Sequence, residues 1–370
     1  MKTRAAVVRE PGELTIEEIT LDPPREGEVL VRMTAAGVCH SDLHTYLGEL
    51  RIMPPLVLGH EGAGVVEDVG PGVTRVAPGD RVMINWLPAD GTCRACLRGD
   101  QHLCERLQRT TFAGMLLDGT TRLHTDDGVD LKHYLTASTM SERMVYMEEA
   151  VIPVPADVPV DVVAITGCAV ITGFGTVVNS AKAEPGSSAV VIGCGGIGLS
   201  MIQGAKLSGC HPIIAVDLVD EKLDLAMQLG ATHTINAARE DAVETVGDLT
   251  GSGADYAFDS VGSGVTINQA LQLIRPGGTA AIAGLHSARA EVAIPAGPLV
   301  LQAKILMGAF GGSLKPRLDL PRLIELYQAG LLQTDQMITK RCKLDDLPEA
   351  FADMEAGRGA RSVIMFDEEE

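Results

Sequence analysis

A glycine-rich turn in the middle of the chain connects a short apolar run to a helix-like segment. Residues 188–192 are typical of a buried strand, and Gly193-Cys194-Gly195-Gly196-Ile197-Gly198 follows, which fits the pattern G-x-G-x-x-G. A helical stretch is expected next, at 199–208. Strands and helices continue to alternate at 212–216, 221–228, 256–258 and 280–283. This alternation predicts an α/β fold with a doubly wound parallel sheet.

The four glycines of this turn indicate nucleotide binding. Without side chains, they let backbone N–H groups approach a pyrophosphate at a helix N-terminus. Asp217, which ends the next predicted strand about 20 residues on, stands where such sites place an acidic residue. Its carboxylate can accept hydrogen bonds from ribose hydroxyls and would repel a 2′-phosphate, which favours NAD over NADP. The alternative is a glycine-rich turn that binds no nucleotide.

The length and charge of the chain narrow the possible partners. With 370 residues, two domains are expected. The net charge of −19 argues against nucleic acid or an anionic membrane as a partner. Apolar runs are shorter than the roughly 18 residues that a membrane span needs, and Arg9 and Glu10 interrupt any signal-peptide core. We therefore expect a soluble, cytoplasmic protein.

The first 170 residues or so have a different pattern. Short β-like runs at 28–33, 64–69 and 81–84 are separated by Gly, Pro and Asp, which predicts an antiparallel, barrel-like β domain. After residue 310 the chain leaves the parallel sheet and forms helices at 320–329 and 347–356. We expect one domain from 1–169 and 311–370, and a second domain from 170–310.

Three of the eight cysteines lie within one loop, and clustered thiols in a reducing compartment indicate metal binding. Cys93, Cys96 and Cys104 are close enough for one lobe, residues 88–105, to surround a tetrahedral zinc ion. Asp90, three residues before Cys93, is the predicted fourth ligand. Four protein ligands leave no open position, so the role would be structural. The alternative is a reduced cysteine loop without metal.

A second possible metal site is dispersed along the chain. Cys39, His60 and Cys168 are two thiols and one imidazole, which could supply three zinc ligands and leave a fourth position open. Their spacing alone does not bring them together, and a buried His or Cys is more often an ordinary core residue.

Taken in order, these motifs resemble a known family nearly from end to end. The segments are Gly-Val-Cys39-His40-Ser41-Asp42, Gly59-His60-Glu61-x-x-Gly64, the cysteine lobe, Gly167-Cys168 and the glycine-rich turn. They are similar to those of zinc-dependent alcohol dehydrogenases of the medium-chain dehydrogenase/reductase superfamily. The resemblance implies a Rossmann NAD-binding domain and a GroES-like catalytic domain that carries the structural zinc lobe.

The resemblance also implies roles for individual residues. Cys39, His60 and Cys168 would hold a catalytic zinc, with Glu61 nearby and Asp42 orienting His60. Ser41 would bond the substrate alcohol, and His44 would form the outer end of a proton relay. The remaining implied contacts are the pyrophosphate for His40 and Arg361, the adenosine ribose for Lys222 and the substrate pocket wall for Trp86.

The implied reaction is the reversible oxidation of an alcohol, with primary or aromatic alcohols favoured, to an aldehyde or ketone. Two zinc ions per subunit and NAD would be the cofactors. Zinc would stabilise the alkoxide, Ser41 would pass the proton through the cofactor ribose to His44, and hydride would move to the nicotinamide. The stretch 111–140 resembles the long loop of dimeric members, which predicts a homodimer, with a tetramer as the alternative.

Several alternatives remain at this stage. A nicotinoprotein would hold NAD(H) permanently and use an external electron acceptor. A formaldehyde dehydrogenase acting on a thiol adduct would need an arginine where Gln108 aligns, although Arg109 is adjacent. A zinc- and nucleotide-binding protein without activity is a third possibility. Simpler roles for individual residues are a helix N-cap (Ser41), an exposed polar residue (His44), a loop histidine (His40) and a core residue (Trp86).

Overall fold

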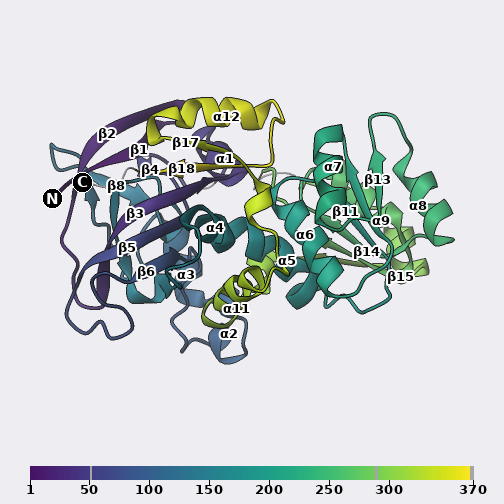
Figure 1. The fold of residues 1–370 in the computed structure, drawn as a ribbon, viewed down its shortest axis with the longest axis horizontal. Helices are drawn as coiled ribbons and strands as arrows, with labels where there is room; N and C mark the ends of the chain where they lie inside the picture. The colour runs from purple at the N-terminus through teal and green to yellow at the C-terminus, as the bar shows by residue number, and fades with distance from the viewer. Residues whose placement is uncertain (51, 288–290, 367–370) are drawn as a thin grey trace. The chain divides into compact units, whose positions relative to one another are not determined.

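A computed structural model describes residues 1–50, 52–287 and 291–366 and divides the chain into two compact units (Figure 1). The first unit comprises Met1–Cys168, Lys315–Gly330 and Thr334–Glu370. The second unit comprises Ala169–Leu314 and Leu331–Gln333.

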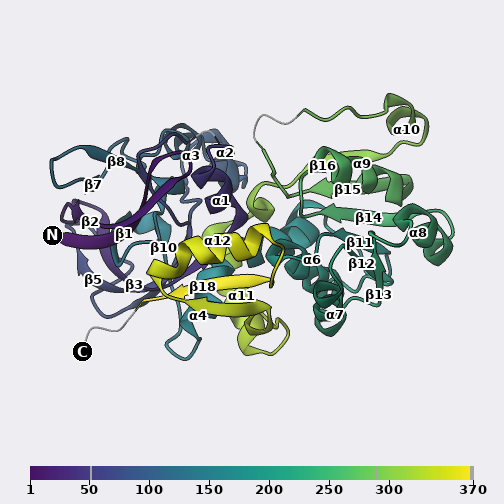
Figure 2. The same cartoon turned by 90° about the horizontal axis from the view of Figure 1, so that it is seen from above.

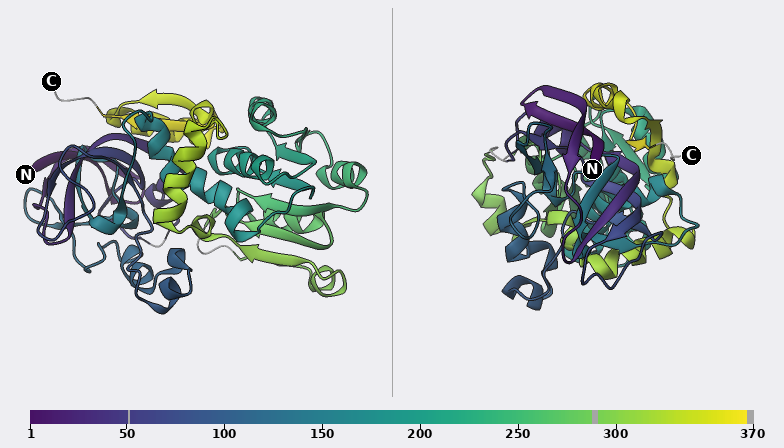
Figure 3. Two further views of the ribbon diagram at one scale, coloured as in Figure 1. Left: turned by 60° about the horizontal axis from the view of Figure 1, so that its bottom comes forward. Right: turned by 90° about the vertical axis from the view of Figure 1, so that its left-hand side faces the viewer.

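The first unit is built from strands. Five of them close into a barrel in the order β1-β2-β7-β8-β4, and the others form a sheet in the order β10-β6-β5-β3-β18-β17, with β9 also paired to β3. In Figure 3 the N-terminal strands, in purple, curve around this barrel. The strands are β1 (Lys2–Glu10), β2 (Glu13–Leu21), β3 (Glu28–Val38), β4 (Leu56–Val57), β5 (Glu61–Val69), β6 (Arg81–Ile84), β7 (Leu123–His124), β8 (Asp130–His133), β9 (Arg143–Met147), β10 (Val151–Pro153), β17 (Ile338–Cys342) and β18 (Arg361–Met365).

The predicted β domain is confirmed, but it is not wholly antiparallel. β4 pairs with β8 in parallel, and β17 pairs with β18 in parallel. The second parallel pair is possible because helix α12 connects β17 to β18, and a parallel pair needs a crossover of this kind. Helices of this unit are α1 (His40–Tyr46), α2 (Arg94–Leu97), α3 (Glu105–Thr111), α4 (Val160–Ile165), α11 (Pro316–Gln328) and α12 (Leu347–Glu355).

The core of the first unit lies between the barrel and the C-terminal segments. Apolar side chains of β1, β3 and α1 pack there with Leu347 and Phe351 of α12 and with Tyr134. Figure 1 shows α12, in yellow, alongside β1 and β17. Helix α1, which follows β3 directly, is therefore held on its buried side by residues more than 300 positions later in the sequence.

The second unit is the predicted doubly wound parallel sheet, with strand order β13-β12-β11-β14-β15-β16. Figure 2 shows β16 and α10 at one edge and β13 at the other. Its elements are α5 (Ile171–Gly175), β11 (Ala189–Ile192), α6 (Gly196–Leu207), β12 (Ile213–Asp217), α7 (Asp220–Leu229), β13 (His233–Asn236), α8 (Ala242–Thr250), β14 (Ala254–Asp259), α9 (Gly264–Leu273), β15 (Ile274–Ile282), α10 (Ala296–Leu301) and β16 (Ile305–Gly308).

The expectation that every apolar run is shorter than a membrane span is wrong. A continuous helical segment, Val160–Ser180, is long and apolar enough to cross a membrane by length and composition. The polar residues of this segment are few and mostly uncharged, so they do not interrupt its apolar character. Since 94% of its most apolar window is buried inside the protein, protein atoms already cover this surface.

His133, at the end of β8, is fully buried and held in a neutral state. Its Nε2 accepts a hydrogen bond from the backbone N–H of Arg122 at 3.3 Å. Burial first, and the Arg122 guanidinium second, lower the pKa of His133 to about 3. A histidine in an unfolded chain has a pKa of about 6.5, so the two states bind protons differently between these values.

We therefore expect His133 to destabilise the fold as the pH falls from about 6.5 to 3, because only the unfolded chain takes up the proton in that window. Between pH 7 and pH 5 this should lower the free energy of unfolding by about 2 kcal/mol. In His133→Gln the side-chain oxygen can still accept the Arg122 N–H, and this loss should disappear. Urea unfolding of both proteins at pH 7 and pH 5 measures this decrease in the free energy of unfolding. An equal decrease in the wild-type protein and in His133→Gln would contradict a neutral, buried His133.

Candidate active site

Four buried side chains from three segments of the first unit meet in one cluster. Cys39 lies between β3 and α1, His60 and Glu61 lie at the start of β5, and Cys168 follows α4. One potential ligand atom from each of the four lies within 4.8 Å of the others. The structure thus brings together Cys39, His60 and Cys168, which the spacing of the sequence alone did not pair.

Asp42 determines the orientation of His60. Its Oδ1 accepts a hydrogen bond from His60 Nδ1 at 3.2 Å and another from the Gly59 backbone at 3.1 Å. Its Oδ2 accepts from the Cys39 backbone N–H at 3.2 Å. With Nδ1 occupied, the other ring nitrogen, Nε2, remains for a ligand. It is buried and has no hydrogen-bond partner among the described residues.

The donor chemistry of this cluster fits a zinc ion. A hydrogen bond from the Cys168 thiol, outweighing the effect of burial, and then His60 lower the pKa of Cys39, so its thiolate form is favoured. Two sulfurs and one imidazole with an unsatisfied Nε2 are a donor set that zinc prefers, and three protein ligands leave a position for substrate. These residues would hold the catalytic metal.

Glu61 is paired with Arg361, a contact that was not anticipated. The Arg361 guanidinium donates to Glu61 Oε2, and both side chains are buried. A Cβ atom at Gly37, opposite in β3, would lie 1.9 Å from the same oxygen, so a glycine there makes room for the carboxylate. Burial raises the pKa of Glu61 to about 7, against the opposing effect of Arg361. The pyrophosphate contact of Arg361 stays a prediction.

Helix α1 carries three of the predicted site residues: Ser41 and His44 of the proton relay, and His40 for the pyrophosphate. Cys39 is its N-cap and Ser41 lies within its first turn, so the alternative that Ser41 is the N-cap is wrong. His44 is 9% exposed, so the alternative of an exposed residue is wrong too, and its Nδ1 lies 2.5 Å from Glu49 Oε2. His40 is exposed, and its ring centroid lies 6.2 Å from that of His44.

Two aromatic rings pack against the ring of His60. Trp86 is buried, and its ring centroid lies 5.9 Å away with an interplanar angle of 83°. Tyr134 lies 5.5 Å away at the same angle. The position of Trp86 agrees with a pocket wall and with a core residue. Sequence reasoning missed Tyr134, because it is one of five tyrosines and belongs to no motif.

The four predicted ligands of the structural zinc also lie close together in the lobe. One potential ligand atom each of Asp90, Cys93, Cys96 and Cys104 lies within 4.8 Å of the others. Partial burial raises the pKa of Asp90, but backbone N–H donors of Cys93 and Thr92 outweigh it and lower the pKa to about 2. An ionised carboxylate among three thiols fits a structural zinc ion with an oxygen in place of a fourth sulfur.

The glycine-rich turn of the second unit has the shape of a phosphate site. Gly193 has a φ of +85°, and a Cβ atom at Gly198 would lie 1.7 Å from the Gly193 carbonyl oxygen, so both need glycine. At Gly195 a Cβ would meet no atom within 4 Å, and this residue caps helix α6 without a side-chain hydrogen bond. The open space and free helix terminus fit a pyrophosphate. Gly196 begins the helix itself.

Asp217 ends β12, as predicted. Its Oδ2 accepts the Cys194 backbone N–H at 2.6 Å, and its Oδ1 accepts those of Leu218 and Val219. A carboxylate has about four acceptor sites, so it can still accept ribose hydroxyls. Lys222 is half-buried in α7.

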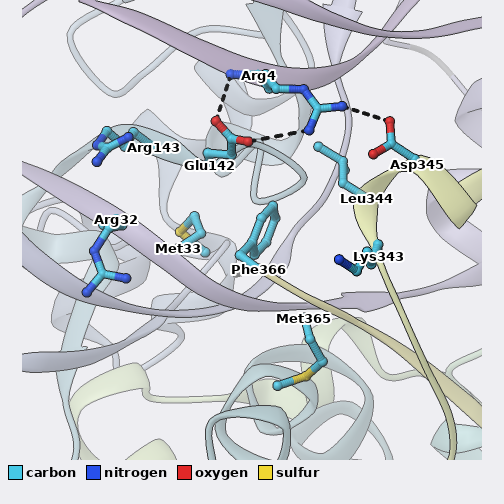
Figure 4. Close-up of a pocket in the computed structure, with 10 residues that line it drawn as sticks. All are labelled: Arg4, Arg32, Met33, Glu142, Arg143, Lys343, Leu344, Asp345, Met365 and Phe366. Carbon is cyan, nitrogen blue, oxygen red and sulfur yellow. Dashed lines mark hydrogen bonds and ion pairs between the residues drawn. The ribbon is translucent and has the colours of Figure 1, made fainter. Parts of the chain in front are cut away.

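A pocket elsewhere in the first unit contains none of the predicted site residues. Figure 4 shows Arg4 bonded to Glu142 and Asp345 along one side of it. Arg32 and Arg143 both pair with Glu67. Because its arginines are neutralised by neighbouring carboxylates, we assign this pocket no part in the reaction.

If Asp90 is a zinc ligand, replacing it should change metal retention in the lobe alone. We expect Asp90→Ala to leave one zinc ion per subunit after dialysis against a chelator, and Asp90→Cys to release the lobe zinc more slowly than wild type, since thiolate is the ligand that zinc prefers. Zinc content per subunit measures both. If Asp90→Ala loses the lobe zinc no faster than the wild-type protein does, the three cysteines hold the metal without this carboxylate.

Comparison with known proteins agrees with this arrangement. A family model described as "Alcohol dehydrogenase GroES-like domain" matches residues 25–156, and one described as "Zinc-binding dehydrogenase" matches residues 196–329. An NDMA-dependent alcohol dehydrogenase from Amycolatopsis methanolica is 41% identical over 370 residues, covering 99% of each chain. An S-(hydroxymethyl)glutathione dehydrogenase from Paracoccus denitrificans is 41% identical over 376 residues, covering 99% of this chain and all of the relative.

A solved structure shows the same fold. The benzyl alcohol dehydrogenase from Acinetobacter calcoaceticus superposes with a TM-score of 0.93 at 31% identity, and the match covers 99% of this chain and 100% of that one. The predicted combination of a GroES-like domain with a Rossmann domain is therefore confirmed. The chain belongs to the zinc-dependent alcohol dehydrogenase family of oxidoreductases, whose cofactors are zinc and NAD.

Proposed function

We propose that this chain reversibly oxidises an alcohol, with primary or aromatic alcohols as the favoured class, and transfers the hydride to NAD. The observation that carries the proposal is the buried cluster of Cys39, His60 and Cys168, with the unsatisfied Nε2 of His60. We assign this chemistry to the domain of residues 1–169 and 311–370, and NAD binding to residues 170–310.

Cys39, His60 and Cys168 would hold a zinc ion, which would supply Lewis-acid stabilisation of negative charge on the substrate oxygen. The chain itself handles the proton. Ser41 and His44 are three residues apart in α1, so they lie on the same face of the helix. Ser41 would accept the alcohol proton, and His44 would be the outer proton acceptor, with Glu49 hydrogen-bonded to its Nδ1.

Burial strengthens the electrostatic interactions of the proposed active site. The side chains of Cys39, His60, Asp42 and Cys168 are all buried, which keeps bulk water from the reacting oxygen. In such surroundings charged and polar groups interact more strongly than in water. Trp86 would cover part of the substrate, and its aromatic ring suits an apolar alcohol.

NAD would bind at the glycine-rich turn. Gly193, Gly195, Gly196 and Gly198 would surround the pyrophosphate, and Asp217 would accept the ribose hydroxyls. Lys222 would contact the adenosine ribose. The pyrophosphate contacts of His40 and Arg361 are proposed from the family resemblance alone.

A second candidate is a nicotinoprotein that keeps NAD(H) bound and passes electrons to an external acceptor. It is supported by the relative that is named NDMA-dependent. A thiol-adduct substrate is supported by the relative named S-(hydroxymethyl)glutathione dehydrogenase, at the same 41% identity. Against it, Gln108 occupies the position where an arginine would be needed, and Arg109, in α3, is exposed.

The decisive experiment measures zinc and cofactor in one purified sample. We expect two zinc ions per subunit and reduction of added NAD with benzyl or short primary alcohols. If the protein carries NAD(H) through gel filtration and turns over only with NDMA, the nicotinoprotein is correct. Activity confined to formaldehyde with glutathione would support the thiol adduct. One zinc ion and no turnover would refute the proposed site.

We also propose a homodimer in the cytoplasm. All eight cysteines are free thiols, as in a reducing compartment. Strand β16 is an edge strand of the parallel sheet. Its first residue, Ile305, and Val300 and Leu301 of the preceding helix α10 are more than half exposed. An apolar sheet edge of this kind aggregates unless another chain covers it, and a second copy pairing through β16 would do so.

This dimer is testable without activity. Sedimentation of the wild-type protein should give twice the mass of the chain, and the double variant Val300→Lys/Leu301→Lys should sediment as a folded monomer. As a control, Met227→Lys changes an exposed apolar residue in α7, a helix that contacts β12 and β13 at the other edge of the sheet. A double variant that stays dimeric would place the interface elsewhere.

A further inference from the structure

Tyr134 contacts two parts of the proposed active site at once. Its ring packs edge-on against the metal-binding candidate His60, with 5.5 Å between ring centroids. Its hydroxyl donates a hydrogen bond to the backbone carbonyl oxygen of Ser41 at 2.8 Å. The side chain is fully buried. One residue therefore touches both the ligand and the residue expected to take the substrate proton, and no motif assigns it a role.

The backbone after Tyr134 is strained. Leu135, Thr136 and Ser138 have φ values of +49°, +59° and +50°, a region that residues other than glycine rarely occupy. Such conformations persist only where the surroundings enforce them, and they concentrate at functional sites. Here Ser138 Oγ accepts the Tyr134 backbone N–H at 3.0 Å and donates to the Val57 carbonyl at 2.9 Å.

The same segment is bonded to the chain that leads into His60. Thr139 N–H donates to the Gly59 carbonyl and Met140 N–H to the Leu58 carbonyl, both at 3.0 Å. Gly59 has a φ of +98°, and a Cβ atom there would lie 2.3 Å from the Met140 nitrogen. The strained turn is thus fixed to the backbone next to the ligand, and Tyr134 extends from it to helix α1.

The hydrogen bond from Tyr134 is one of two that the Ser41 carbonyl oxygen accepts from hydroxyl groups. The Ser41 carbonyl oxygen also accepts a bond from Thr45 Oγ1 at 2.9 Å, but that bond is local to α1. Of these two donors, only Tyr134 joins the helix to another segment.

We propose that Tyr134 is a positioning residue, which fixes Ser41 relative to His60 by bonding the Ser41 carbonyl with its hydroxyl and supporting the His60 ring with its own. This inference rests on the proposed function for the roles of Ser41 and His60. It assigns to the strained turn after β8 the task of setting the distance between the proton acceptor and the metal ligand.

Two variants separate the hydroxyl from the ring. Tyr134→Phe removes only the hydroxyl, and we expect kcat to fall about 5- to 10-fold with little change in KM, as expected for one lost hydrogen bond that acts during the reaction. The pH profile of kcat should move to higher pH, because a displaced Ser41 accepts the proton less readily. Tyr134→Leu also removes the ring. With cobalt(II) in place of zinc, its visible absorption should differ from wild type, whereas that of Tyr134→Phe should not.

Tyr46→Phe is the matched control, since it also removes a tyrosine hydroxyl that joins α1 to another segment, by a bond to the Gly12 carbonyl oxygen at 3.0 Å, but at the other end of the helix from Ser41. Its pH profile should stay at that of wild type. If Tyr134→Phe changes only the melting temperature, or if Tyr46→Phe shifts the profile equally, Tyr134 is a core residue and the inference is overturned.

Failure of the proposed function can be distinguished from failure of this inference, because the wild-type protein itself would then reduce no cofactor with any alcohol. In that case the cobalt spectra decide the inference alone. A spectrum of Tyr134→Leu identical to that of wild type would overturn it.

Discussion

The buried carboxylate of Asp42 joins the two chain segments on which the active site depends. It accepts hydrogen bonds from the Cys39 backbone, the Gly59 backbone and the His60 ring. A carboxylate with no exposure to water is costly unless its oxygens are bonded, and here three donors from both segments supply those bonds. Loss of this one group would free the thiol-bearing segment and the imidazole-bearing segment from each other, and would release the His60 tautomer that leaves Nε2 available.

Close backbone approach is the second constraint on the site. Glycine at position 37 makes room for the Glu61 carboxylate, and glycine at position 59 lets the chain pass the Met140 backbone. A Cβ atom at Gly167, next to the ligand Cys168, would lie 2.7 Å from the Ile84 carbonyl oxygen. The segments that carry the ligands approach their neighbours so closely that only glycine fits at these three positions. The cluster is therefore held from several sides and not by its ligands alone.

The contiguous parts of both sites were predictable from the sequence. The turn at Gly193–Gly198 is found between the predicted strand and helix, although α6 begins at Gly196, three residues earlier than expected, because the last glycines already adopt helical geometry. Asp90, Cys93, Cys96 and Cys104 gather as their spacing suggests. The dispersed ligands required the family resemblance, since no local pattern connects Cys39 to Cys168. The pairing of Arg361 with Glu61 was not foreseen, because the two residues lie 300 positions apart.

The sequence by itself determined the parallel nucleotide-binding sheet and the metal lobe, because each depends on residue types at short intervals. Short intervals need little loop-closure entropy, so local pattern and local structure agree. The class of chemistry followed from the order of the motifs along the whole chain, which resembles that of a known family. Only the tertiary structure decided which backbone atoms the supporting side chains bond. Tyr134 bonds a backbone carbonyl, and Asp42 bonds two backbone N–H groups, and such atoms are the same in every residue. A contact to a backbone atom leaves no mark in the sequence of the partner, so it becomes visible only when the chain is folded.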